Sequence, residues 1–320
     1  MDINVIFNIQ VQASSAECRD MQTPSFAASL KETLWQQYRK IAACRSDSTM
    51  NNYATAIRAL SAYLESDIAL QDLTAAELGG FERWLQHRGL CLNTISCYMR
   101  SLRSLLMAID EGHVRKCFST VYTGNARTEK RSVSTDAIAR LKALALPVGS
   151  FSELARDVFL FSFYAMGMPF VDVAHLRRTQ VEKGRFCYNR QKTGQRVTVA
   201  VEPAMAEIIS RHATSETAND YVFPLLTTGS HREYCTALGR YNRTLHRLAV
   251  MAGIRENLTS YVVRHTWASM AYGANVDLPV ISKALGHTNP QTTLTYIREI
   301  DDQRLAKANH EIISKICYET

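Results

Sequence analysis

Two stretches of this sequence say most about its architecture: LTSYVVRHTWA at residues 258–268 and LGHTNPQTTLTY at residues 285–296. In the second stretch, Asn289 followed by Pro290 is typical of a helix N-cap and first helical position. A helix that begins there places Tyr296 almost two turns in and leaves His287 in the preceding turn. We therefore expect a phenol and an imidazole in a short, fixed spatial relation.

Each of these residues also has an ordinary structural explanation. A single tyrosine on an amphipathic helix is more often a packing residue, and a single turn histidine is more often hydrogen-bonded locally. A phenol that attacks phosphate needs nearby groups that take its proton and neutralise the phosphorane. The joint occurrence of Arg264, His287 and Tyr296 in this order favours the chemical interpretation over the structural one.

Three motifs follow one another: RHTWA at 264–268, LGH at 285–287, and a tyrosine nine residues after that histidine. With a Lys192-Thr193-Gly194 turn and a helical region upstream, the pattern resembles the tyrosine recombinase (phage integrase) family over about residues 26 to 310. The details look most like integrases of Bacteroides-type mobile elements, notably FVDVAHL at 170–176 and YVVRHTWAS at 261–269.

The resemblance implies a site-specific DNA recombinase and a role for each motif. Tyr296 would be the nucleophile that forms a 3′-phosphotyrosyl link and releases a 5′-hydroxyl. Arg264 would hold the non-bridging phosphate oxygens, and His287 would hydrogen-bond the same phosphate. Lys192 would protonate the leaving 5′-oxygen. No metal or cofactor is expected, because the covalent link conserves the phosphodiester energy.

Two positions depart from the family pattern. Family members carry a second arginine in a Gly-Leu-Arg-like segment, but here Pro169 stands after Gly167-Met168, and Met166 precedes the glycine. Arg177 or Arg178 is a possible stand-in for the missing arginine. The second departure is Tyr261, which occupies a position where a histidine is usual. A tyrosine can hydrogen-bond phosphate, but it is a poor base near neutral pH because its ordinary pKa is about 10.

The implied fold is mainly α with a small β-hairpin or sheet: an N-terminal helical core-binding bundle and a catalytic domain that close as a C-shaped clamp on DNA. The expected boundaries are an N-terminal extension at 1–25, a core-binding domain at 26–112, a basic linker at 113–133, a catalytic domain at 134–300 and a C-terminal tail at 301–320. The extension alternates apolar and polar residues from Ile3 to Val11, which predicts a strand.

The helical periodicity of the N-terminal half is interrupted by capping signals. Ser48 is expected to cap one helix, Thr74 to open a second through a capping box with Glu77, and Asn93 to cap a third. In the second half, Ser134 is expected to cap a helix, and Phe151 to Tyr164 reads as a buried helix. A shorter helix is expected at 171–176, and a hairpin at 184–201 with its turn at 192–195.

The net charge of +7 is unevenly distributed. Residues 26–112 are neutral overall, whereas 113–135 hold five basic residues against one acidic residue. Such an excess favours contact with a polyanion, although a solvated linker explains it equally well. The expected DNA-binding side chains lie on the third helix and in the linker: Thr94, Ser96, Arg100, Arg103, Arg115, Lys116, Lys130 and Arg131.

Composition excludes several other classes of protein. The eight cysteines form no CxxC pair, so we expect neither a zinc site nor a disulfide framework. The longest stretch poor in charge, 158–171, is shorter than the roughly 18 residues of a membrane span, and no secretory signal is evident. We therefore expect a cytoplasmic bacterial protein that acts on DNA.

Two further expectations concern partners and activity. The tail carries Leu305, Ile312, Ile313 and Ile316, which suit docking on a neighbouring protomer or on the chain's own catalytic domain. We expect assembly on double-stranded DNA, as a tetramer. The alternative to a recombinase is a DNA-binding protein of the same fold whose strand cleavage is weak or lost, since the second arginine is missing.

Overall fold

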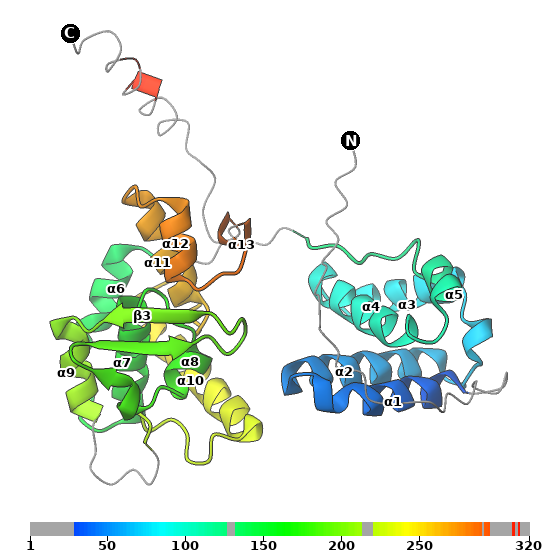
Figure 1. Ribbon diagram of the computed structural model, residues 1–320, viewed down its shortest axis with the longest axis horizontal. Coiled ribbons are helices and arrows are strands. Elements are labelled where there is room, and N and C mark those ends of the chain that lie inside the picture. The colour runs from blue at the N-terminus through cyan, green and yellow to red at the C-terminus, as the bar shows by residue number, and fades with distance from the viewer. Residues whose placement is uncertain are drawn as a thin grey trace, which may run out of the picture. The chain divides into compact units, whose positions relative to one another are not determined.

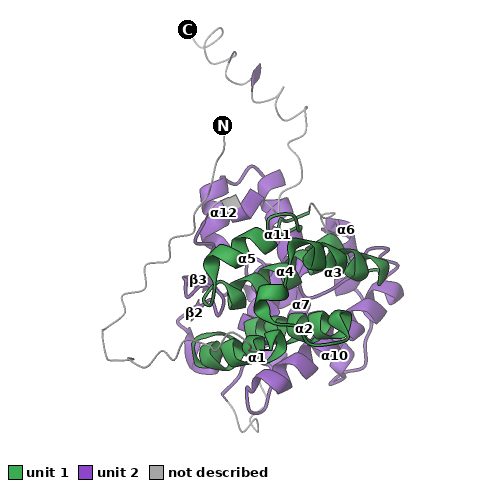
Figure 2. Cartoon of the chain, turned by 90° about the vertical axis from the view of Figure 1, so that its right-hand side faces the viewer, with its two compact units in different colours: residues 1–127 green, residues 128–320 purple. Residues whose placement is uncertain are grey.

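The computed structural model describes residues 29–126, 132–212, 220–289, 291–294, 309–310 and 313. The chain divides into two compact units, residues 1–127 and 128–320 (Figure 2). The strand expected from Ile3 to Val11 lies outside the described residues, as does most of the tail. Among the helices described, none is long and apolar enough to cross a membrane.

Unit 1 is a helical bundle (Figure 1). Its helices are α1 (Leu30–Ile41), α2 (Asp47–Leu64), α3 (Ala75–His87), α4 (Leu92–Leu106) and α5 (Glu111–Cys117), with 3-10 turns at Ala42–Cys44 and Leu70–Asp72. The bundle encloses a single apolar core, in which α2 packs on both α1 and α4. Ile57 and Phe81 are fully buried there, as the helical periodicity of the sequence requires.

Two of the expected helix caps in unit 1 differ from those in the structure. Thr74 caps α3 as expected, accepting a hydrogen bond from the Glu77 N–H at 3.1 Å. The cap of α2 is Ser46 and not Ser48, because the helix begins at Asp47. The N-cap of α4 is Cys91, whose Sγ lies 3.2 Å from the Thr94 Oγ1. Asn93 is thus a residue of α4.

Helix α5 occupies residues that the sequence analysis assigned in part to the linker. Asp110 caps it by accepting from the His113 N–H at 2.9 Å, and Val114 and Cys117 are buried in the core of unit 1. The loss of periodicity after residue 112 therefore reflects a helix of only two turns, which is too short to show a repeat.

Unit 2 is built around the buried helix α7 (Phe151–Tyr164), whose bounds match the expected ones. Helices α6 (Thr135–Lys142), α9 (Pro203–His212), α10 (His231–Met251) and α11 (Val262–Gly273) pack against α7. Ser134 caps α6, as expected, by accepting from the Ala137 N–H at 3.1 Å. The short helices are α8 (Phe170–Ala174), α12 (Leu278–Ala284) and α13 (Gln291–Leu294).

A small antiparallel sheet lies on this helical core (Figure 1). Strands β2 (Arg185–Asn189) and β3 (Arg196–Ala200) form the expected hairpin, and β1 (Val181–Glu182) adds an edge strand that the sequence did not indicate. Phe186 pairs with Val199, and Tyr188 pairs with Val197. These four side chains are buried in the same apolar core as α7, so the mainly helical fold with a small sheet is confirmed.

Candidate functional site

Arg264 lies in the first turn of α11 and is only 2% exposed. Its Nη1 donates to the backbone oxygen of Gly167 at 3.0 Å, and its Nη2 donates to the backbone oxygen of Leu285. A Cβ at Gly167 would lie 2.9 Å from the Arg264 Cα, and the φ of Gly167 is +69°, so only glycine fits between α7 and α11 here. Backbone carbonyls of two segments therefore fix this guanidinium group.

His287 lies in the loop between α12 and α13, half-buried beside Arg264. Its Nε2 is 3.1 Å from Nη2 of Arg264, and its Nδ1 is 2.9 Å from Oγ1 of Thr293 on α13. Burial lowers the pKa of His287 to about 4, and the charges of Arg264, Arg190 and Lys192 act in the same direction. The imidazole is therefore neutral at pH 7.

Arg190, at the end of β2, is a member of this cluster that the sequence analysis missed. It is 7% exposed, and its Nη1 donates to the Leu285 oxygen at 2.6 Å. The same oxygen accepts from Arg264, so two guanidinium groups converge on one carbonyl. A Cβ at Gly286 would lie 2.9 Å from the Arg190 Cδ, so the loop before His287 packs directly on the arginine side chain.

Asp172 of α8 holds Arg190 in place. Its Oδ2 is 3.3 Å from the Arg190 Nε, and its Oδ1 accepts from the Gln191 N–H at 3.0 Å. Burial raises the pKa of this carboxyl group, while the Gln191 N–H and the charges of Arg190 and Arg264 oppose the rise. Because Asp172 is 4% exposed, it orients Arg190 from inside the protein.

Lys192 is exposed in the turn between β2 and β3. The next residue, Thr193, donates from Oγ1 to the Gly286 oxygen at 3.1 Å, which ties the turn to the loop that carries His287. The Lys192 charge also contributes to the low pKa of His287. The structure therefore brings Lys192 to the same cluster as Arg264, Arg190 and His287.

Of the two tyrosines expected to take part in catalysis, the structure describes only Tyr261. Tyr261 is the N-cap of α11, 55% exposed, with its ring edge-on to His265 at 4.7 Å. Tyr296 lies outside the described residues, just beyond the end of α13 at Leu294.

The described side-chain contacts of Arg177 and Arg178 are with Tyr221 and not with the cluster around Arg264. Arg177 stacks over the Tyr221 ring at 5.5 Å, and Arg178 donates from Nε to the Tyr221 oxygen at 3.3 Å. Among the described contacts, Arg190 shares a backbone acceptor with Arg264, whereas the side-chain contacts of Arg177 and Arg178 are with Tyr221.

The face of α4 that was expected to bind DNA is less exposed than the sequence indicated. Ser96 is fully buried, and its Oγ donates to the Gly124 oxygen at 2.6 Å. Asn93 is paired with Ala126 through both its Oδ1 and its Nδ2, and Arg100 donates to the Asn125 side chain at 3.3 Å. Residues 124–126 therefore cover part of this face, because small polar side chains on α4 bind their backbone.

The other expected DNA-binding residues remain accessible where they are described. Thr94 and Arg103 are partly exposed, whereas Arg115 and Lys116 are exposed at the end of α5, where Arg115 pairs with Glu111 at 2.8 Å. Lys130 and Arg131 lie outside the described residues.

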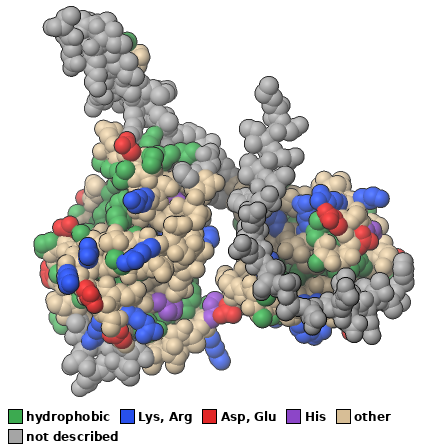
Figure 3. All heavy atoms as spheres, in the orientation of Figure 1, with side chains coloured by type: hydrophobic (Ala, Val, Ile, Leu, Met, Phe, Trp, Pro, Cys, Tyr) green, Lys and Arg blue, Asp and Glu red, His purple; other side chains and the backbone are tan. Residues whose placement is uncertain are grey.

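A groove on unit 2 that is lined by residues with polar or charged ends was not expected from the sequence. It lies along α10 and the segment before α11, and it is lined by Arg240, Asn242, Arg243, Thr244, His246, Arg247, Asn257 and Thr259. Asn242 accepts from the Ser260 N–H at 2.8 Å and so fixes the segment that leads into Tyr261 and Arg264. In Figure 3, Lys and Arg side chains are also spread over the outer face of the sheet.

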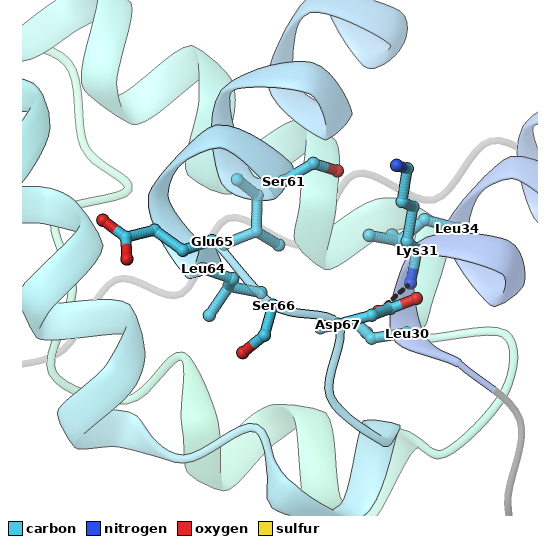
Figure 4. Close-up of a pocket in the computed structure, with 9 residues that line it drawn as sticks. Leu30, Lys31, Leu34, Ser61, Leu64, Glu65, Ser66 and Asp67 are labelled. Atoms are coloured by element: carbon cyan, nitrogen blue, oxygen red, sulfur yellow. Dashed lines mark hydrogen bonds between the residues drawn. The ribbon is translucent and has the colours of Figure 1, made fainter.

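A pocket in unit 1 lies between the start of α1 and the end of α2 (Figure 4). Its polar side chains include Glu65 and Asp67, and Asp67 accepts from the Lys31 N–H at 3.2 Å. Two carboxylates make it unsuited to phosphate. In the parts of the chain that the structure describes, no group of three His, Cys, Asp or Glu residues has the spacing of a metal site.

Comparisons with known proteins agree on one family. The model of the phage integrase family matches residues 149–303, and the model of the phage integrase SAM-like domain matches residues 26–120. The tyrosine recombinase XerC of Rhodospirillum centenum is 24% identical over 269 residues, which cover 78% of this chain and 78% of the relative.

Solved structures share the fold at low identity. The Tn1549 transposon integrase in complex with transposon right end DNA matches with a TM-score of 0.69 and 12% identity, over 90% of this chain and all of that chain (100%). A lambda integrase dimer bound to a core site matches with a TM-score of 0.65 and 16% identity, over 84% of this chain and 95% of that chain.

Proposed function

This chain belongs to the phage integrase family and is a tyrosine-type, site-specific DNA recombinase, and we propose that its chemistry takes place at the cluster of Arg264, Arg190, His287 and Lys192. The observation that carries this proposal is the convergence of two buried guanidinium groups on the Leu285 oxygen. Two such groups with a shared acceptor are spaced to bind one phosphate group.

In the proposed reaction, Tyr296 is the nucleophile. Its phenol loses its proton to solvent as the oxygen attacks the scissile phosphorus, a 3′-phosphotyrosyl bond forms, and the bond to the 5′-oxygen breaks. Lys192 gives a proton to that leaving oxygen, and a 5′-hydroxyl is released. Attack by the 5′-hydroxyl of another strand reverses these steps and rejoins the DNA, so no external energy source is consumed.

Arg264 and Arg190 hold the non-bridging oxygens of the phosphate in this proposal. Arg190 takes the role of the arginine missing at Pro169, in place of the earlier candidates Arg177 and Arg178. Charge-assisted bonds from two guanidinium groups stabilise the additional negative charge of the phosphorane. His287 and Tyr261 add hydrogen bonds to the same phosphate.

The DNA duplex contacts both units in this proposal. Residues 26–112 together with α5 form the core-binding domain, the rest of 113–133 forms the linker, and 134–300 form the catalytic domain. Thr94, Arg100 and Arg103 of α4 contact the phosphate backbone, as do Arg115, Lys116, Lys130 and Arg131. Ser96 is removed from this set because it is buried. The groove along α10 adds Arg243 and Arg247 as exposed cationic side chains.

The finer context of the reaction is also a proposal. The stretches at 170–176 and 261–269 support a recombinase of a Bacteroides-type mobile element, acting in the bacterial cytoplasm. The related lambda integrase has been solved as a tetramer bound to a Holliday junction. We propose the same assembly here, with the tail at 301–320 docking on a neighbouring protomer.

A nicked suicide substrate that carries the element's own end sequence tests the function. We expect a denaturant-resistant adduct of protein and DNA, which Tyr296→Phe abolishes. Tight specific binding without an adduct would instead support the alternative, a DNA-binding protein of the same fold with lost strand cleavage. Sizing of the complex on DNA separates a tetramer from smaller assemblies.

A further inference from the structure

The hydrogen bonds of His287 define which of its nitrogens carries the proton. Arg264 can only donate, so the His287 Nε2 that lies 3.1 Å from its Nη2 is an acceptor without a proton. In a neutral imidazole the proton is then on Nδ1, which lies 2.9 Å from the Thr293 Oγ1. The protein without DNA therefore holds the Nδ1–H tautomer.

This tautomer is unsuited to a bound phosphate. Phosphate oxygens only accept hydrogen bonds, so the lone pair on Nε2 would repel the very group that His287 contacts in the proposed mechanism. The ring must carry a proton on Nε2 when the phosphate is present. A doubly protonated ring is disfavoured by the three cationic groups that face it, Arg264 on α11 and Arg190 and Lys192 on the hairpin.

A hydroxyl group at Nδ1 resolves this conflict. It accepts from Nδ1–H in one tautomer and donates to a bare Nδ1 in the other, so the ring keeps its partner when the proton changes nitrogen. Thr293 is fully buried, which leaves its hydroxyl group directed at His287 without competition from bulk water. It also lies three residues before Tyr296 in the sequence.

We propose that Thr293 is a positioning residue that lets His287 change from a hydrogen-bond acceptor, facing Arg264, to a donor, facing the scissile phosphate. The proton balance is closed, since Nδ1 loses one proton to solvent and Nε2 gains one. This inference rests on the proposed function for the phosphate contact, but the tautomer in the free protein is independent of it.

The first experiment tests the free protein. Proton–nitrogen correlation spectra of the full chain, isotope-labelled in histidine and assigned with His287→Gln, report which ring nitrogen carries the proton. We expect the Nδ1–H form in the wild type and in Thr293→Ser, and loss of this preference in Thr293→Val. An Nε2–H form in the wild type would overturn the proposal.

The second experiment measures the rate of adduct formation on the suicide substrate. We expect Thr293→Val to lower the rate about 10-fold, part of the roughly 10²–10³ that loss of one preorganised hydrogen-bond donor to the transition state costs. Thr293→Ser should restore most of the rate, and DNA affinity should be unchanged. The matched control is Thr292→Val, since Thr292 is the exposed neighbour on α13.

A double variant separates positioning from a general packing role. In a His287→Ala background, Thr293→Val should have no further effect on the rate, because the hydroxyl group acts through the imidazole. An equal loss with and without His287 would overturn the proposal. If the wild type forms no adduct at all, the proposed function fails, and the spectra alone decide the role of Thr293 in the tautomer.

Discussion

In the proposed mechanism, Arg190 provides the second phosphate-binding guanidinium group that the family pattern places at position 169. Its position after β2, its pairing with Asp172 and the shared Leu285 oxygen bring its guanidinium group beside that of Arg264. Pro169, at the family's arginine position, is the N-cap of α8 with a φ of −63°, which an arginine also adopts without strain. An arginine at position 169 therefore requires no change in the backbone.

Arg190→Ala should lower the rate of adduct formation about 10²–10³-fold, because one preorganised cationic contact to the phosphorane is lost. The control is Arg185→Ala, an exposed arginine at the start of β2, which should leave the rate near that of the wild type. Adding Pro169→Arg to Arg190→Ala should recover part of the loss. An unchanged rate in Arg190→Ala would show that this guanidinium group does not touch the reacting phosphate.

His287 should make stability depend on pH. Its pKa is lowered to about 4 in the folded protein, while the unfolded value is about 6.5. The unfolded state therefore binds more protons between these values, so the contribution is complete above pH 6.5 and is lost as pH falls towards 4. For this half-buried group we expect on the order of 1 to 2 kcal/mol after solvent screening.

Denaturant titrations at a series of pH values measure this contribution. His287→Gln should flatten the fall in the free energy of unfolding between pH 6.5 and 4, relative to the wild type. Parallel curves for the two proteins would mean that His287 titrates normally in the folded state.

At the scale of elements, helix α9 is attached to α7 through a buried carboxylate. Asp157 accepts from Arg156 at 2.9 Å, from Arg211 at 2.7 Å and from His212 at 2.9 Å. These bonds lower the pKa of Asp157 against the opposing effect of burial, which is the largest single influence. The carboxylate therefore satisfies donors from both helices at once.

Asp157→Asn should destabilise unit 2 by roughly 3 kcal/mol, since it removes the buried negative charge that Arg156 and Arg211 share. Thermal unfolding at neutral pH measures the change. Glu207→Gln is the control: Glu207 also pairs with Arg211, but its side chain is 70% exposed, so we expect less than about 1 kcal/mol.

The sequence predicted the helices and strands better than it predicted which side chains bind residues distant in the sequence. The bounds of α7, the hairpin and the Thr74 and Ser134 caps follow from periodicity and local side-chain chemistry. The covering of α4 by residues 124–126 does not, because Ser96 and Asn93 bind backbone groups about thirty residues away. Arg190 was missed for the same reason: its partners Asp172 and Leu285 are distant in sequence.

At the scale of the whole molecule, the net positive charge is unevenly divided along the chain. Residues 26–112 are neutral overall, so the net charge of +7 arises mainly beyond them. Phosphate contacts release condensed counterions, and each contact adds about −0.9 to the slope of log K against log salt. Most of the salt dependence of DNA binding should therefore come from residues 113–320.

Removing residues 1–112 should lower site-specific affinity while preserving most of that salt slope. Binding titrations of both proteins across a range of salt concentrations, on the element end and on an unrelated duplex, measure the two effects. Unchanged site-specific affinity in the truncated protein would contradict a DNA-binding role for unit 1.

The Leu285 carbonyl affects how the phosphate of a DNA substrate binds to Arg264 and Arg190. Without DNA, Arg190 and Arg264 both donate to the neutral Leu285 oxygen. A phosphate that binds there must therefore replace an existing hydrogen-bond acceptor. Such a substitution yields little net free energy by itself. We therefore expect small anions to compete poorly with DNA for Arg264 and Arg190. Most of the binding free energy should come from contacts with the flanking duplex, so the cluster should bind a complete recombination site and leave free phosphate unbound.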